Sequence, residues 1–461
     1  MHMCRRCNAS WALVIFLLFL CSSFTLLGSY EVFASELPEL TLSEVLRITK
    51  EANPTIVAAS RKIDQAAARV LQAVSAKSPT LDVSLAYQET EEEPNYPVYD
   101  GTTGGPTEHK YYAKGGFKRS WKAAMSMSYL LYSGGSVENN IKAQELAKKV
   151  AEAEYKRTVQ HIENDAARAY YNLLKANDHY MVAKEALKLS QEHFRQVEAF
   201  YKHGVVPKNE VLRVQVAVSQ AELDLIQAQS ALDIAWLVLE RVAGTEMKGK
   251  YRLVPAEGES LLKDKFSVPK DPVSMAFKMR PEIKALESVR QSALRLAKAA
   301  MGKKRPQILL SGEAYKADED FPPDAMDDWR VSVAAVWTLY DGQKAEAEAK
   351  EAVAKAEEVL YSLEDLKRGI SLEVNTAIKK LEAAVKRIDV AKNQVAKAEE
   401  DYRMALRRYS AQVGTNIDVL DARVALINAK NNFSDAVYEA KIAEADLQFA
   451  LGATEVEKKD S

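Results

Sequence analysis

The hydrophobic positions of this chain follow two different periods. Residues 137–203 contain neither proline nor glycine, and residues 341–410 contain no proline. In the second segment apolar residues recur every three or four positions, with many lysines and glutamates between them. That narrow stripe is typical of helices that pack side by side in a coiled coil. As single helices these segments would each reach about 100 Å at 1.5 Å per residue, too long for a compact domain.

Shorter segments alternate apolar and polar residues with period two. The alternation runs through residues 81–87, 123–131 and 331–339, whereas residues 307–315 alternate poorly. We expect four strands, at about 79–90, 121–133, 306–317 and 328–340, whose length suits a tilted transmembrane strand. Aromatic residues cluster at their ends and resemble the girdle of a membrane barrel: Trp121, Trp329, Trp337, Tyr132 and Tyr340.

Four strands cannot close a barrel alone, and an open sheet edge cannot face lipid. The strands therefore belong either to a soluble sheet packed on helices or to a barrel that other copies of the chain complete. No segment outside the helices could cover the apolar faces of a soluble sheet, which favours the second alternative.

The chain also repeats itself. Trp121 matches Trp329 and Tyr201 matches Tyr409, each pair 208 residues apart, and the same offset joins LLYSGG at 130–135 to TLYDGQ at 338–343. Each half holds a helix (41–77 or 271–304), two strands and a long helical hairpin (137–243 or 341–451). We therefore expect repeats at 35–244 and 271–452, joined by a connector at 245–270 and followed by a short tail at 453–461. The first repeat has extra residues that include a polar segment, 91–112, expected to be a long exposed loop.

Residues 1–34 have the features of an export signal. Arg5 and Arg6 precede an almost wholly apolar run, 11–27, and small residues before Ser35 suit cleavage. The alternative is a retained membrane anchor, since the run is near the length that spans a bilayer. All three cysteines lie in this segment, so the mature chain would have none and could form no disulfide or thiolate metal site.

Composition argues against several classes of function. The charged residues make up 28% of the chain but balance to a net charge of −2, which gives no sign of a nucleic-acid-binding face. The six histidines show no metal-ligand spacing, and no catalytic motif is present. We expect no enzyme activity, no cofactor and no metal site, with the histidines of the long helices on the surface.

Each long helical pattern breaks once, and chemistry-bearing residues follow the second break. Gly204 and Gly414 would permit the turns. Asp418 and Asp421 lie three residues apart and share a helix face. One interpretation of Asp418 is a helix cap, because a carboxylate in the first turn favours the helix dipole; that role does not explain Asp421.

At this point the chain resembles the TolC family of outer-membrane efflux channels. The resemblance rests on Asn53-Pro54, the LYSGG and LYDGQ joints, IDVLDA at 417–422 and Leu451-Gly452, twice and in order. It implies an α+β membrane protein that forms a homotrimer in the outer membrane. Four strands per protomer would build a 12-stranded barrel in outer-membrane lipid, continuous with a periplasmic α-helical barrel. Such channels dock onto a periplasmic adaptor and an inner-membrane transporter. The alternative is an exported periplasmic coiled-coil scaffold without channel activity.

The resemblance also implies roles for the residues near the breaks. Asp418 and Asp421 would line the pore constriction, and Tyr409 would bond Glu210. The family member that we compare has an arginine at the position of Gly414 that ties the closed entrance together, so this entrance would be held either more weakly or by other contacts. Residues of both hairpin tips would face the adaptor: Gly204, Val205, Val206, Val413 and Gly414.

Overall fold

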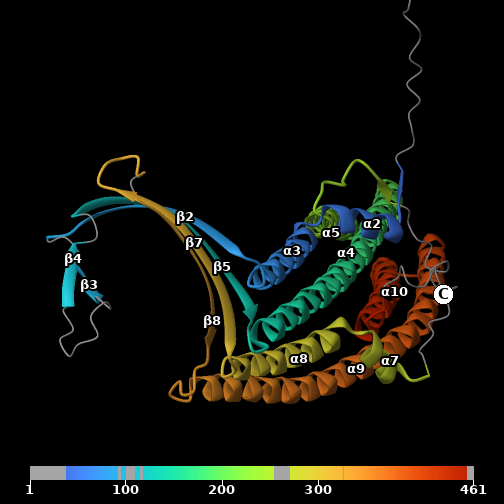
Figure 1. Ribbon diagram of the computed structural model, residues 1–461. Coiled ribbons are helices and arrows are strands. Elements are labelled where there is room, and N and C mark those ends of the chain that lie inside the picture. The colour runs from blue at the N-terminus through green and yellow to red at the C-terminus, as the bar shows by residue number, and fades with distance from the viewer. Residues whose placement is uncertain are drawn as a thin grey trace, which may run out of the picture.

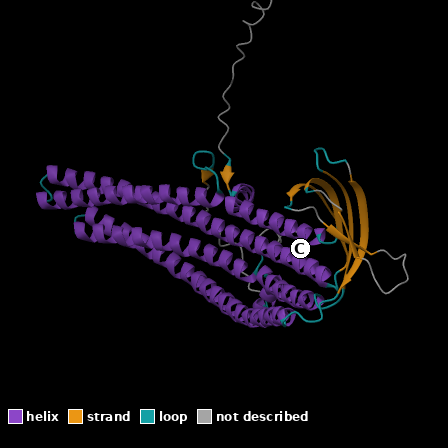
Figure 2. Ribbon diagram, turned by 60° about the vertical axis from the view of Figure 1, so that its left-hand side comes forward, coloured by secondary structure: helices purple, strands orange, loops and turns teal. Residues whose placement is uncertain are grey.

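The computed structural model describes residues 38–91, 95–99, 110–114, 118–253, 270–324 and 326–453. The expected export signal, most of the expected connector and the tail beyond residue 453 lie outside this part of the chain. Long helices run side by side, and a curved sheet extends from one end of them (Figures 1 and 2).

Two helical hairpins form the body of the molecule. The helix α4 (Ser136–Lys202) is followed by α5 (Lys208–Ala243), and α9 (Lys344–Ser410) is followed by α10 (Asn416–Leu451). Both α4 and α9 have 67 residues, and both α5 and α10 have 36. Equal lengths in both halves are what the internal duplication requires.

The first helix of each repeat is broken, although one continuous helix was expected. The break separates α2 (Leu42–Ala52) from α3 (Pro54–Ser75), and α7 (Pro272–Met279) from α8 (Pro281–Gly302). Proline lacks the backbone N–H that an uninterrupted helix needs, but it suits the first turn of a new one. The repeated prolines are therefore helix starts.

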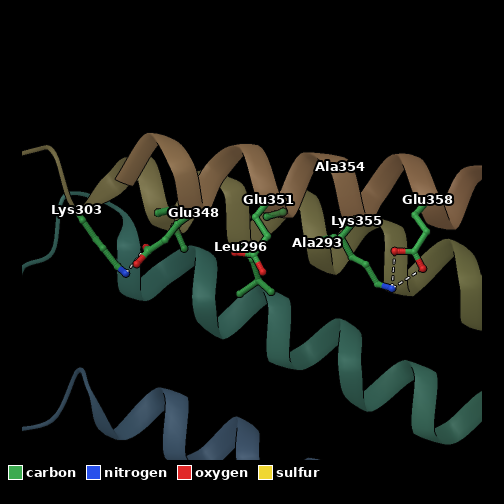
Figure 3. Close-up of a pocket in the computed structure, with 11 residues that line it drawn as sticks. Ala293, Leu296, Lys303, Glu348, Glu351, Ala354, Lys355 and Glu358 are labelled. Carbon is green, nitrogen blue, oxygen red and sulfur yellow. Dashed lines mark hydrogen bonds and ion pairs between the residues drawn. The ribbon is translucent and has the colours of Figure 1, made fainter. Parts of the chain in front are cut away.

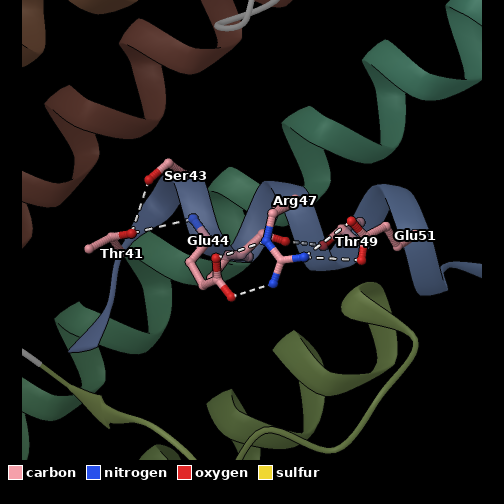
Figure 4. Close-up of polar contacts among 7 residues, drawn as sticks. Thr41, Ser43, Glu44, Arg47, Thr49 and Glu51 are labelled. Carbon is pink, nitrogen blue, oxygen red and sulfur yellow. Dashed lines mark hydrogen bonds and ion pairs between the residues drawn. The ribbon is translucent and has the colours of Figure 1, made fainter. Parts of the chain in front are cut away.

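The short helix α2 is stabilised at both ends by local side chains. The hydroxyl of Thr41 accepts a hydrogen bond from the backbone N–H of Glu44 (3.3 Å), and Arg47 forms ion pairs with Glu44 and Glu51 (Figure 4). At the break, the side chain of Asn53 caps α3 and also donates to the carbonyl of Val242 in α5 (2.7 Å). The break is therefore fixed to the end of the first hairpin.

A glycine at the end of each hairpin permits this contact. A Cβ at Gly244 would lie 2.6 Å from the carbonyl oxygen of Ala52, and a Cβ at Gly452 would lie 3.0 Å from Cγ of Arg280. Both glycines also have positive φ, which favours residues without a side chain. In both repeats the end of the hairpin therefore packs against the break in the first helix in the same way.

The main sheet has four antiparallel strands in the order β2-β5-β7-β8: β2 (Thr80–Glu89), β5 (Arg119–Tyr132), β7 (Gln307–Asp318) and β8 (Met326–Val336). The expected fourth strand extended too far, because β8 ends at Val336 and leaves Trp337 and Tyr340 in the turn before α9. The expected loop at 91–112 was also partly wrong. It contains β3 (Asn95–Tyr99), which pairs with β4 (Lys110–Lys114).

The two faces of the main sheet differ in polarity. Register places Val83 beside Met125, and Leu81 beside Met127, on one face. The other face carries the Lys122–Glu313 ion pair (2.7 Å) and the hydrogen-bonded hydroxyls of Ser311 and Ser332 (2.7 Å). The apolar face is exposed along its length, so nothing in the described chain covers it: Leu81, Val83, Leu85, Met125, Trp329, Val331 and Val333.

The hydrophobic core is divided into clusters. One joins α2, α4 and α5 around Leu173 and Leu239 and also includes Tyr438 of α10, and another joins α9 and α10 around Ile370 and Val374. The two-residue strands β1 (Glu39–Leu40) and β6 (Arg252–Leu253) pair in parallel and hold the start of the connector against the start of the first repeat. Among the described helices, none has a stretch apolar enough and long enough to cross a bilayer.

Candidate functional site: the two hairpin tips

The first hairpin tip is a regular helix C-terminus. Gly204 has φ +73° and its N–H donates to the carbonyl of Tyr201 (2.9 Å), while the N–H of Val205 donates to the carbonyl of Phe200 (2.9 Å). These two bonds define a Schellman motif. Pro207 then precedes α5 without a side-chain cap.

The second tip has the same backbone with different residues. The N–H of Gln412 donates to the carbonyl of Tyr409 (3.0 Å), and the N–H of Val413 donates to the carbonyl of Arg408 (3.0 Å). The left-handed residue is Gln412, with φ +60°. Gln412 lies 208 residues after Gly204, so it is the aligned position in the second repeat.

Gly414 permits the second turn for a different reason from Gly204. Its φ is not positive; instead, a Cβ there would lie 2.9 Å from Cβ of Arg408 and 3.2 Å from the backbone N of Tyr409. Gly414 is required because the chain crosses closely over the end of α9. An arginine at this position would meet the same obstacle.

Asp418 caps the helix that carries it. Its carboxylate accepts a hydrogen bond from the N–H of Thr415 (3.0 Å), and its own N–H donates to the hydroxyl of Thr415 (3.2 Å), which completes a capping box. The backbone bond from Thr415, then the bond to its side chain, lower the pKa of Asp418. Asp421 is exposed on the same helix, and the described chain gives it no ion pair. Asp418 therefore has the capping role that was one interpretation of it, whereas Asp421 is exposed and takes no part in the cap.

Tyr409 and Glu210 lie together between the two hairpins. Tyr409 is 4% exposed and belongs to a cluster with Val197, Val214 and Val419, which come from α4, α5 and α10. Burial, then the charge of Glu210 and a hydrogen-bonding contact with it, raise the pKa of Tyr409 to about 12. The contact is loose, because neither the Tyr409 hydroxyl nor Oε2 of Glu210 makes a hydrogen bond of regular geometry to a described residue.

Sequence reasoning missed a buried polar group beside this cluster. His193 of α4 is 3% exposed, and its Nε2 donates to Oδ1 of Asn416, the first residue of α10 (2.7 Å). Nearby, the guanidinium of Arg423 in α10 donates to the hydroxyl of Ser190 in α4. The expectation that the histidines lie on the surface is wrong for His193. His193 lies on the stripe of α4 that is buried at Ala183, Ala186, Ser190 and Val197. The spacing of three and four residues along this stripe is the sequence signal that could have indicated its burial.

The expected adaptor-facing residues are not equally available. Val205 and Val413 are exposed, with Val413 at 68%, and Gly204 has open space around it. Val206 instead packs against the buried cluster of Tyr409. Each tip therefore exposes one valine.

The expected girdle aromatics fall at both ends of the sheet. Near the loops, the ring of Trp121 contacts the tilted ring of Tyr87 (5.0 Å between ring centroids) and meets Phe321 edge to face (5.3 Å). Exposed Trp329 lies on the same apolar face. Tyr132, Trp337 and Tyr340 lie at the helical end, where the indole N–H of Trp337 donates to the carbonyl of Lys304 (2.9 Å).

The cavities elsewhere in the described chain are grooves between helices. One of about 640 Å³ lies between α8 and α9, lined by alanines, Leu296 and the ion pairs Lys303–Glu348 and Lys355–Glu358 (Figure 3). These ion pairs leave Glu351 as the one further charged residue of its lining. No cluster of metal-ligating residues occurs in the described part of the chain.

Comparison with solved structures shows which fold this arrangement represents. A crystal structure of CusC superposes with a TM-score of 0.75 at 17% identity, over 91% of this chain and 93% of that one. The open state of the Neisseria gonorrhoeae MtrE outer membrane channel superposes with a TM-score of 0.72 at 19% identity, over 89% of each chain. The expected fold class is thereby confirmed: strands for a β-barrel domain joined to long helices of a helical barrel.

Sequence comparison gives the family. The alkaline protease secretion protein AprF of Pseudomonas aeruginosa is 24% identical over 62% of this chain and 60% of AprF. The outer membrane protein TolC of Escherichia coli is 22% identical over 67% of this chain and 65% of TolC. The chain thus matches less than two thirds of the length of either relative. The family described as outer membrane efflux protein matches residues 45–245 and 273–453, well over half of the chain. The chain therefore belongs to the outer membrane efflux protein family and is an outer-membrane protein whose helical part lies in the periplasm.

Proposed function

We propose that three copies of this chain form a channel through the outer membrane that passes substrates outward from the periplasmic side. The observation that carries this proposal is the order of the sheet. The first strand, β2, and the last, β8, are its two edges, and every neighbouring pair is antiparallel.

The two edges are complementary. Because neighbours alternate in direction across four strands, β8 runs antiparallel to β2, so β8 of one copy can pair with β2 of the next. Three copies would close a ring of twelve strands with no free edge, the condition that lipid imposes on a sheet. The apolar face would then contact lipid, and the face with Lys122 and Glu313 would line a wet lumen.

The helices also leave a face for another copy. The exposed apolar side chains of α5 recur at spacings of three, four, seven and eight residues, which places them along one side of the helix: Leu212, Val216, Leu223, Ile226, Ile234 and Leu237. Exposed apolar patches of this extent mark interaction surfaces. A neighbouring copy would cover this stripe as the helical barrel closes.

In such a trimer Asp418 and Asp421 would form two rings of carboxylates at the periplasmic entrance. Rings of like charge attract cations and oppose one another's ionisation. The cap bond keeps Asp418 ionised against that repulsion, because it lowers the pKa of this carboxyl. The entrance would therefore be cation-selective.

The exposed hairpin tips indicate where partner proteins would bind. Exposed Val205 and Val413 would meet a periplasmic adaptor, which in turn joins an inner-membrane transporter that supplies energy. With cysteine placed at either valine, crosslinks to the adaptor would support this contact. Crosslinks only to neighbouring copies would contradict it.

Purification from membranes tests the channel itself. We expect a detergent-extracted trimer that resists dissociation and conducts ions in a planar bilayer. A proline in the middle of β8, such as Val333→Pro, should prevent trimer formation because it removes a ladder hydrogen bond. A monomer in the soluble periplasmic fraction would instead support the alternative of an exported coiled-coil scaffold.

A further inference from the structure

Two polar contacts fasten the second hairpin to the first just above the tips. They are His193 with Asn416, and Ser190 with Arg423; in both, the first residue belongs to α4 and the second to α10. We call these four residues the clasp. Asn416 begins the turn of helix that carries Asp418, so the clasp holds the constriction carboxylates directly.

We propose that His193, Asn416, Arg423 and Ser190 position the second hairpin tip in the closed entrance, and that a proton on His193 releases it. The proposal rests on the channel function above and adds residues and a chemical trigger to it. It also explains how an entrance with Gly414 in place of an arginine is held.

The surroundings of His193 offer no acceptor for a second proton on its ring. Its Nε2 donates to Asn416, so the neutral ring carries its lone pair on Nδ1. Nδ1 is buried and has no hydrogen-bond partner in the described chain. The ring also contacts Tyr409, edge to face, at 5.2 Å between centroids. A proton added at Nδ1 would be a buried donor without an acceptor, which costs free energy.

Charge adds to this cost. Arg423 is 6% exposed and forms no ion pair with a described residue. A protonated His193 would thus be a second cation beside a buried, unpaired one. Burial first, then the charge of Arg423, lower the pKa of His193, against the opposing bond to Asn416.

Other titratable groups around the clasp do not supply a counter-charge at His193. Burial, with the charges of Glu192 and Glu185 adding to it and that of Arg423 opposing it, raises the pKa of Tyr402, so that phenol stays neutral. Two carboxylates of the neighbouring helix α5 act on other groups: Glu210 on Tyr409, and Asp224 on Arg423.

The direction of the pH effect follows from these contacts. We consider a histidine whose pKa is lowered in the closed state and ordinary in the open state. Its full contribution to the stability of the closed state is present at any pH above the ordinary pKa. That stability is lost as the pH falls from the ordinary value, near 6.5, toward the lowered one, because only the open state then binds the proton. The ratio of open to closed entrances should rise by up to about tenfold per pH unit over that interval.

The test is the open probability of the purified trimer in planar bilayers between about pH 7.5 and about pH 5.5, which brackets the ordinary pKa of histidine. The wild-type channel should open as the pH falls. His193→Gln keeps a donor for Asn416 but cannot take up a proton, so its open probability should stay low throughout. His203→Gln, at the exposed end of α4, is the matched control and should respond like the wild type.

A second variant keeps the experiment decisive if His193→Gln fails to assemble. Arg423→Met retains His193 but removes the neighbouring cation, so the acid response should shrink. A wild-type channel that conducts but ignores pH, or variants of His193 and Arg423 that respond as the wild type does, would overturn the clasp alone. A chain that forms neither trimer nor conductance at any pH would overturn the channel function as well.

Discussion

The two hairpin tips share one backbone but depend on different side chains. The first tip has Gly204 in its left-handed position and no side-chain cap. The second has Gln412 in that position and a complete capping box formed by Thr415 and Asp418. Duplication thus preserved the geometry, whereas only the second tip acquired local bonds that fix a carboxylate. A tip that positions charge must be held more firmly than one that only contacts a partner.

Neutralising the carboxylates should show the largest functional difference between the two tips. Asp418→Asn together with Asp421→Asn should move the reversal potential in a salt gradient toward zero, because the proposed acidic rings would be gone. The aligned change in the first tip, Glu210→Gln, should leave it near the wild-type value, since that carboxylate faces Tyr409. An unchanged reversal potential in the double variant would show that the constriction lies elsewhere.

A methyl group at each tip glycine tests two different constraints. Gly414→Ala should cost about 1–3 kcal/mol of local stability because its Cβ meets the end of α9. Gly204→Ala should cost about 1–2 kcal/mol, from left-handed backbone alone.

Hydrogen exchange of the tip amides measures both costs. Gly414→Arg should speed amide exchange at the second tip at least as much as Gly414→Ala does. An arginine that instead slowed exchange would contradict the close approach to Arg408.

Removing the cap should affect one tip only. Thr415→Ala should cost about 1 kcal/mol and fray the start of α10, since Asp418 loses the hydroxyl that its N–H donates to. Pro207→Ala removes no side-chain hydrogen bond and should leave amide exchange at the first turn of α5 nearly unchanged. Equal fraying in both variants would remove the distinction between the tips.

The smallest expected effect is a gain. Gln412→Gly would give the second tip the residue that the first already has, and should stabilise it by up to about 1 kcal/mol because φ of +60° strains a residue with a Cβ. Gly204→Gln is the reverse change and should destabilise the first tip by about 1–2 kcal/mol, as Gly204→Ala does. The rate of amide exchange at Val413 measures the effect of Gln412→Gly, and the rate at Val205 measures the effect of Gly204→Gln.

Periodicity and duplication predicted most of the architecture. Proline-free patterns located the long helices, and period-two alternation located three of the four strands. The broken first helices were missed because Asn53-Pro54 was used as a sequence marker and not as a helix start. The extent of β8 was overestimated because Trp337 and Leu339 continue the alternation, although the chain there already turns toward α9.

The candidate site was less predictable because its chemistry depends on contacts between distant segments. The cap on Asp418 is local, and the sequence suggested it. The hydrogen bond of His193 joins it to Asn416, 223 residues away, and the need for glycine at 414 depends on the path of the chain over Arg408. No one-dimensional pattern records either contact.

The placement of β2 and β8 at opposite edges also affects how the protein is made. In the proposed trimer no single chain contains a finished membrane domain, so folding of that domain and assembly are one event governed by mass action. Its yield should therefore depend steeply on local concentration during export. Defective chains should be dominant in a mixed population, because one copy with a damaged edge leaves the two sound copies of its ring unable to close.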